Sequence, residues 1–110
     1  MKRRPFLERF ASRKQRPKAV VGVAWYANEQ TWAEMKAFAE DPERYENSYT
    51  EWVAIASDTV VKLGKQGLEL VKIPMDPEVF RQWLEVRGEK NNANSRAAYA
   101  SEKVREYHQA

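Results

Sequence analysis

The run of residues 19–27, AVVGVAWYA, is the longest uncharged apolar stretch of this chain and constrains its fold more than any other feature. Its residues are β-branched, aromatic or small, and no polar residue alternates with them, which is typical of a strand buried on both faces. A second run, residues 67–73, is closed by Pro74 and predicts a second strand. A membrane-spanning helix needs roughly 20 apolar residues, so neither run is expected to cross a bilayer.

Two helices are predicted between these strands. The first begins at Asn28 or Thr31, either of which can cap it, and ends before Pro42, because a proline restricts the residue that precedes it. The second covers residues 49–63, where apolar side chains recur with the strongest helical periodicity in the chain. Gly64 is placed to end this helix in the left-handed conformation.

Two further helices are predicted after the second strand. Asp76 and Pro77 form a strong start signal for the first of them, and Gly88 ends it. The last helix starts at Asn94 or Ser95, and its apolar stripe is thin and rich in alanine. Such a stripe predicts either weak packing or a very close neighbour.

The predicted order is strand, helix, helix, strand, helix, helix, which makes residues 19–110 a single helix-rich α+β domain. If each helix runs back along the layer, two helices return the chain to the end where it started, and the two strands are then antiparallel. A sheet of two strands is marginal in water. The first strand, apolar on both faces, favours a central position, so we expect that a homodimer could join two such sheets into one of four strands.

Charge divides the chain into two parts. Residues 1–18 contain eight basic side chains and one acidic one, a net charge of +7, whereas residues 19–110 have a net charge of −4. This asymmetry predicts a basic, mobile arm that binds nucleic acid or another polyanion, or else a solvated end without a binding role. The candidate anion-binding residues of the arm are Arg3, Arg4, Arg9, Arg13, Lys14, Arg16 and Lys18.

The stretch RRPFL near the N-terminus resembles the core of a twin-arginine export signal. An export signal needs an apolar segment soon after its charged residues and a small-residue cleavage site. Here five more basic residues precede the first apolar run, and no Ala-x-Ala site follows that run. We therefore expect the protein to remain in the cytoplasm.

Few residues of this chain can support catalysis. Cysteine is absent and the only histidine, His108, lies near the C-terminus. Disulfides and thiolate chemistry are thereby excluded, and a histidine-based triad, a metal site or another cofactor is not expected. Carboxylates remain: Glu43, Glu46 and Glu51 cluster in sequence, and Glu29 follows the first strand. Helix capping explains Glu29 and Glu51 more simply than catalysis does, so the chain is not expected to be an enzyme.

The end of the first strand is the expected place for a small-ligand site. Ligands commonly bind where strands end and helices begin, in pockets lined by aromatic side chains and a few polar groups. The tryptophans also fall on predicted buried faces, so the alternative is that they form the hydrophobic core. The candidate pocket residues are Trp25, Tyr26, Asn28, Glu29, Tyr49 and Trp52.

Four segments, VVGVAWY, SYTEW, GLELVKIPMDPEVFRQW and SRAAYASE, together resemble a group of short bacterial proteins with no assigned function. In that group a strand ending in Ala-Trp-Tyr precedes a Tyr-x-Glu-Trp helix, and Gly-Leu-x-Val, a Pro-x-Asp turn and a Phe-x-x-Trp helix follow. The resemblance covers roughly residues 20–102 and leaves out the basic arm. It implies a compact bacterial cytosolic domain and supplies no catalytic residues.

These observations favour a non-catalytic binding or interaction module. Nucleic-acid association through the basic arm is the first alternative. The second is a carboxylate-dependent enzyme, or a small-ligand binder, with its site at the end of the first strand.

Overall fold

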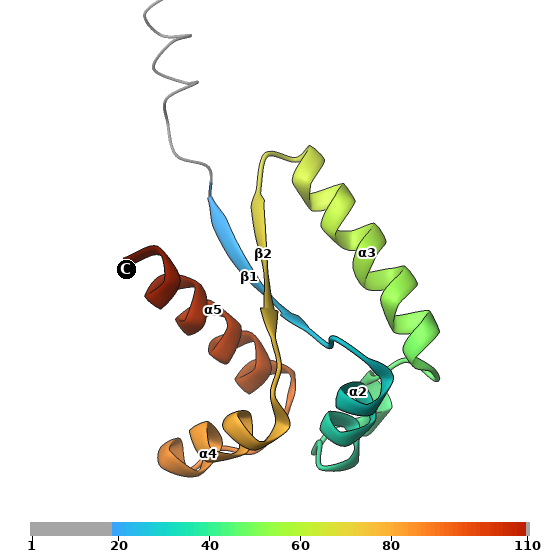
Figure 1. Cartoon of the computed structure of the whole chain (residues 1–110), viewed down its shortest axis with the longest axis vertical. Helices are drawn as coiled ribbons and strands as arrows, with labels where there is room; N and C mark the ends of the chain where they lie inside the picture. Colours follow the sequence, from blue (N-terminus) through green and yellow to red (C-terminus); the bar gives the residue numbers. More distant parts are fainter. Residues whose placement is uncertain (1–18, 110) are drawn as a thin grey trace, which may run out of the picture.

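A computed structural model describes residues 19–109 (Figure 1). They form an α+β domain, as predicted, with four α-helices and a two-stranded sheet. None of the helices between residues 19 and 109 is both long and apolar enough to span a membrane. The elements in chain order are β1 (Val20–Trp25), α2 (Glu29–Ala37), the short 3₁₀ helix η1 (Pro42–Arg44), α3 (Tyr49–Lys65), β2 (Glu69–Pro74), α4 (Pro77–Arg87) and α5 (Ala93–Gln109).

The two strands are parallel, so the predicted antiparallel sheet is wrong. The register runs from Val20 opposite Glu69 to Trp25 opposite Pro74. Helix α2 has nine residues, about 14 Å, and lies beyond the carboxyl end of β1 without running back along the sheet (Figure 1). Only α3, with 17 residues and a length of about 25 Å, returns the chain to the start of β1. One returning helix makes a β-α-β unit, whose strands are parallel.

Helix α5 packs very closely on β1. A side-chain carbon added at Gly22 would collide with the carbonyl oxygen of Ala100 and with the side chain of Val104. Ala100 is fully buried, and Val104 is also part of the hydrophobic core. The thin, alanine-rich stripe of the last helix thus has the close neighbour that the sequence predicted as one of two outcomes.

Strand β1 is neither central nor buried on both faces in the sheet that the described residues form. That sheet contains β1 and β2 alone, so each strand has one open edge. Val21 is 39% exposed. The face of β1 opposite α5 is only partly covered. Helix α3 lies on that side, and Trp52, near its start, is its one buried residue. The expectation of two buried faces is therefore wrong for the described chain.

Helix α3 continues past Gly64 to Lys65, so the predicted cap at Gly64 is wrong. Gly67, with φ of 91°, takes the left-handed conformation instead. The Gly67 amide donates to the Gly64 carbonyl, and the Leu68 amide donates to the Leu63 carbonyl, which is the Schellman arrangement. At the end of α4, Gly88 has φ of 63° and forms the cap that the sequence predicts.

Aromatic side chains dominate the hydrophobic core. Trp32, Trp52 and Trp83 are buried, as predicted, whereas Trp25 is half-buried. Phe80 is completely buried and its ring contacts those of Trp83 and Tyr99, with centroids 5.8 and 5.2 Å away. This aromatic packing joins α4 to α5.

Candidate functional site

A pocket of about 370 Å³ lies beside the carboxyl-terminal half of β1. We call it the β1-edge pocket. Its walls come from β1, from the η1 segment, from α3 and from the first two turns of α5, and its volume is within the range of known ligand sites. Its lining residues are Gly22, Val23, Ala24, Tyr26, Arg44, Tyr45, Glu46, Trp52, Ala93, Arg96 and Ala97.

The pocket extends along the edge of β1 rather than over one of its faces. Gly22, Val23 and Ala24 all line it, although consecutive residues of a strand point to opposite faces. Three consecutive residues can contribute to one pocket when that pocket lies along the strand edge. Because β2 occupies the other edge, the pocket lies at the open edge of β1.

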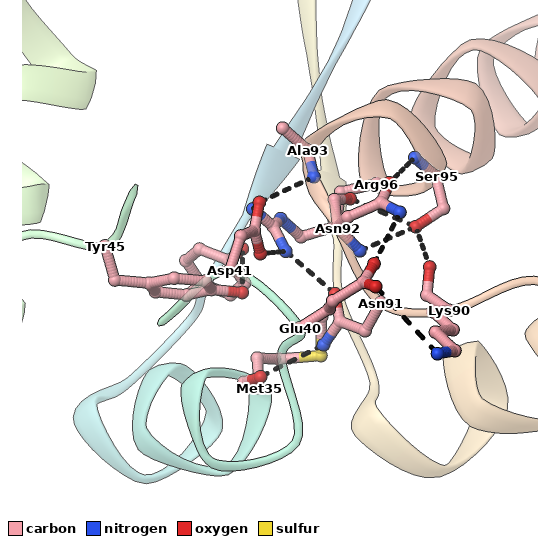
Figure 2. Close-up of polar contacts among 11 residues, drawn as sticks. Met35, Glu40, Asp41, Tyr45, Lys90, Asn91, Asn92, Ala93, Ser95 and Arg96 are labelled. Atoms are coloured by element: carbon pink, nitrogen blue, oxygen red, sulfur yellow. Dashed lines mark hydrogen bonds and ion pairs between the residues drawn. The ribbon is translucent and has the colours of Figure 1, made fainter. Parts of the chain in front are cut away.

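Two buried polar residues, Asn91 and Arg96, and the partly buried Asp41 form a frame behind the pocket; we call these three the polar frame (Figure 2). The Arg96 guanidinium donates to both carboxylate oxygens of Asp41, at 2.9 and 3.0 Å, and to the Asn91 side-chain oxygen at 2.8 Å. The Ala93 amide donates to Asp41 at 2.9 Å. The frame therefore fixes the segment after α2 to the start of α5.

Asn91 extends the frame to α2. The Asn91 side-chain amide donates to the Met35 backbone carbonyl at 3.0 Å. The Asn91 backbone carbonyl accepts from the Glu40 backbone amide at 2.7 Å. The start of α5 is capped by two reciprocal hydrogen bonds. The Ser95 and Asn92 side-chain oxygens each accept from the other residue's backbone amide at 2.9 Å. These bonds fix the start of α5, from which Ala93, Arg96 and Ala97 line the pocket.

Both charges of the polar frame are stable around neutral pH. Burial alone would raise the pKa of Asp41, but hydrogen bonds and charge from Arg96, together with the Ala93 amide, outweigh it and lower that pKa. Burial alone would lower the pKa of Arg96, and Asp41 outweighs it and raises that pKa. The pair remains ionised, and its net charge is zero.

The aromatic wall of the pocket carries two hydroxyl groups. The Tyr26 and Tyr45 hydroxyl oxygens lie 3.2 Å apart, the Trp52 ring lies 4.8 Å from that of Tyr26, and the Arg96 guanidinium lies 4.8 Å over the ring of Tyr45. Burial raises the pKa of both tyrosines, so both hydroxyls keep their hydrogens at neutral pH.

Tyr26 and Tyr45 each have one hydroxyl hydrogen, but the bond between them uses only one of these two hydrogens. Whichever of Tyr26 and Tyr45 donates to the other, the second hydroxyl hydrogen has no acceptor among residues 19–109. Both side chains line the pocket. The wall can therefore donate one further hydrogen bond, to an acceptor on a ligand.

The structure brings four of the six predicted pocket residues together. Tyr26 and Trp52 line the pocket. Trp25 packs against Trp52 with ring centroids 4.9 Å apart, and the Tyr49 hydroxyl donates to the Tyr26 carbonyl at 2.9 Å. These two residues support the wall from behind.

The other two predicted pocket residues serve α2 instead. Asn28 is its N-cap, accepting from the Thr31 amide at 2.8 Å, which decides between the two predicted caps. Glu29 is exposed in the first turn of α2.

Sequence reasoning missed the polar frame and Tyr45. In the sequence, Asp41 only precedes the proline that ends a helix, and Tyr45 falls in a segment without periodicity. One signal was available for Arg96: it lies four residues before Ala100, on the same side of α5 as the apolar stripe. A charged residue on such a stripe indicates a buried ion pair, but nothing local indicates its partner, which is 55 residues away.

The remaining candidates from the sequence are the carboxylates and the basic residues of the arm. Among the predicted carboxylates, Glu46 lines the pocket, whereas Glu51 accepts from the Asn47 amide at 3.2 Å as part of the cap of α3. No group of three or more His, Cys, Asp or Glu side chains suited to a metal ion occurs in the described part of the chain. The seven basic candidates of the arm lie outside the described residues.

No protein-family model, no curated protein and no solved structure matches this chain.

Proposed function

We propose that this protein is a non-catalytic binding module of the bacterial cytosol and that the β1-edge pocket is its binding site. The observation that carries the proposal is the pocket itself. A volume of about 370 Å³, an aromatic wall and the polar frame are combined beside the carboxyl-terminal half of β1. Ligands of open parallel sheets usually bind at the carboxyl ends of the strands.

The chemistry of the wall favours binding over catalysis. The Asp41 carboxylate is committed to Arg96 and to the Ala93 amide, so it is not available as a base. The raised pKa values of Tyr26 and Tyr45 keep these hydroxyls protonated. A general base or nucleophile needs a free, activated group. Apart from the Glu46 carboxylate, the wall offers fixed donors and aromatic surface instead.

Two neighbouring alanines of α5 allow a direct test. Ala97 and Ala98 are both exposed, but Ala97 lines the β1-edge pocket and Ala98 does not. Phenylalanine at position 97 should fill the pocket and weaken binding at least about tenfold, whereas Ala98→Phe should leave binding unchanged. The probes are phenol, benzamide and benzoate, and binding is measured by saturation-transfer NMR. If none of the three binds at millimolar concentration, or if both variants lose binding equally, the proposed site is wrong.

Association of the basic arm with nucleic acid is the second candidate function, and the charge asymmetry favours it. Binding of a fluorescent 20-nucleotide single strand should weaken by at least about tenfold between 50 and 200 mM salt, because phosphate contacts release counterions. Removal of residues 1–18 should abolish it. Anisotropy titrations of both proteins check this. Binding that survives the deletion would rule out the arm as the site.

A further inference from the structure

Strand β1 presents unpaired backbone groups on its open edge. The Glu69 amide donates to the Ala19 carbonyl, and the Met75 amide donates to the Trp25 carbonyl. In a parallel ladder, alternate residues of a strand bond to the same neighbour, so the odd-numbered residues of β1 pair with β2. The amides and carbonyls of Val20, Gly22 and Ala24 consequently point to the other edge, where no residue between 19 and 109 bonds to them.

The open edge of β2 is protected, whereas that of β1 is not. By the same alternation, the edge residues of β2 are Leu70, Lys72 and Pro74. Proline has no amide hydrogen and lysine brings a charge, and both features block pairing with another strand. Helix α3 also packs beside β2 (Figure 1). The edge of β1 has only valine, glycine and alanine, so a further strand can pair with it.

The unpaired backbone groups of the β1 edge lie directly beside the β1-edge pocket. Gly22 and Ala24 belong to the unpaired row and also line the β1-edge pocket. Gly22 is only partly buried although α5 covers one of its faces. A row of alternating amides and carbonyls is complementary to another extended backbone, and a hollow beside it holds a side chain of that backbone.

We propose that an extended peptide segment of a partner protein adds a strand to the open edge of β1 and places a large apolar side chain in the β1-edge pocket. This inference rests on the proposed function and names the class of its ligand. Arg44 and Glu46 line the pocket with opposite charges, which favours a neutral side chain there. The spare hydroxyl hydrogen of the tyrosine pair can donate to a carbonyl of the peptide.

A second copy of this chain fits the edge less well. If two β1 strands paired antiparallel around Gly22, Val20 of one copy would lie opposite Ala24 of the other. A valine side chain is too small to fill a pocket of about 370 Å³. The homodimer expected from the sequence remains a prediction. The test below includes a measurement of the molecular mass in solution, which distinguishes a dimer from a monomer.

The test uses the whole protein and an acetylated, amidated heptapeptide of alternating valine and threonine with phenylalanine at its centre. Two N-methylated forms of this peptide are compared, each with methyl groups on alternate amides. Only one of the two sets of amides can face β1, so one form should lose at least about tenfold in affinity while the other binds like the parent peptide. Equal affinities of the two forms overturn the proposal.

Amide hydrogen exchange gives a second readout on the unmodified chain. The peptide should slow exchange at Val20, Gly22 and Ala24, because these amides gain hydrogen bonds, and should leave Val21 and Val23 little changed, since they already pair with β2. Replacement of the central phenylalanine by alanine should weaken the peptide about tenfold, as should Ala97→Phe in the protein. Unchanged exchange at the three edge amides overturns the proposal.

The outcomes separate this inference from the proposed function. If the small aromatic probes bind in a manner that depends on Ala97 but the peptide does not bind, the pocket stands and the peptide proposal falls. If light scattering shows a dimer whose edge amides are already protected, the occupant is a second copy and the peptide proposal is again wrong. If neither probe set binds, both proposals fail.

Discussion

Replacing Gly22 with alanine should lower the free energy of unfolding by about 3 kcal/mol, at the upper end of the usual cost of overpacking a core. The added carbon would meet the Ala100 carbonyl oxygen and the Val104 side chain, so α5 must move away from β1 to accommodate it. The Ala100 oxygen is backbone and cannot rotate aside. Urea unfolding followed by circular dichroism measures the effect.

Gly64→Ala is the matched control for this substitution. Gly64 lies inside α3, and a carbon added there meets no atom within 4 Å. Alanine is a better helix former than glycine, so this variant should be more stable by about 0.5–1 kcal/mol. If the two alanine variants had similar stabilities, the close packing of α5 on β1 would be incorrect.

Replacing Arg96 with methionine should cost about 3–5 kcal/mol, the usual effect of removing one partner of a buried ion pair. The Arg96 and Asp41 side chains are only 10% and 13% exposed. Without the guanidinium, the Asp41 carboxylate loses two hydrogen bonds and the Asn91 side-chain oxygen loses its donor. Thermal and urea unfolding measure the loss. The double variant Asp41→Asn/Arg96→Met should cost less than the sum of its single variants.

The same pair predicts a pH dependence. The pKa of Asp41 is lower in the folded protein than in the unfolded chain, so its contribution to stability is present above about pH 4 and is lost as the pH falls below that value. In Arg96→Met the guanidinium that lowers the pKa of Asp41 is gone, so burial should raise the pKa of Asp41 above its value in the unfolded chain. Stability contributed by Asp41 should then fall as the pH rises through about 4 and above, and the Asp41→Asn variant should show neither slope. Identical pH profiles of the wild type and Arg96→Met would contradict this account.

Most of the secondary structure was predictable because its signals are local. The caps at Asp76 and Gly88 and the periodicity of α3 lie within a few residues of the structure that they specify. The local pattern predicts the cap of α3 at Gly64, three residues before Gly67, which forms it. Both glycines follow the last strong apolar position, and their different backbone conformations depend on how the chain turns into β2.

The candidate site was only partly predictable. Tyr26 and Trp52 follow from their places at the end of β1 and the start of α3. The polar frame joins Asp41 to Arg96 across 55 residues, and no local pattern pairs them. The open edge of β1 likewise depends on which strand lies beside which, so sequence alone could not indicate that Gly22 contributes both to packing and to a pocket.

The sequence by itself determined the α+β class, the identity of the elements and the aromatic core, since short-range propensity and hydrophobic periodicity act on neighbouring residues. Strand direction was decided only in the tertiary structure. Helix α2 is too short to run back along the sheet, and α3 alone closes the connection, which makes the strands parallel. That single geometric outcome places the carboxyl ends of both strands together, and β1 keeps an open edge where the pocket forms.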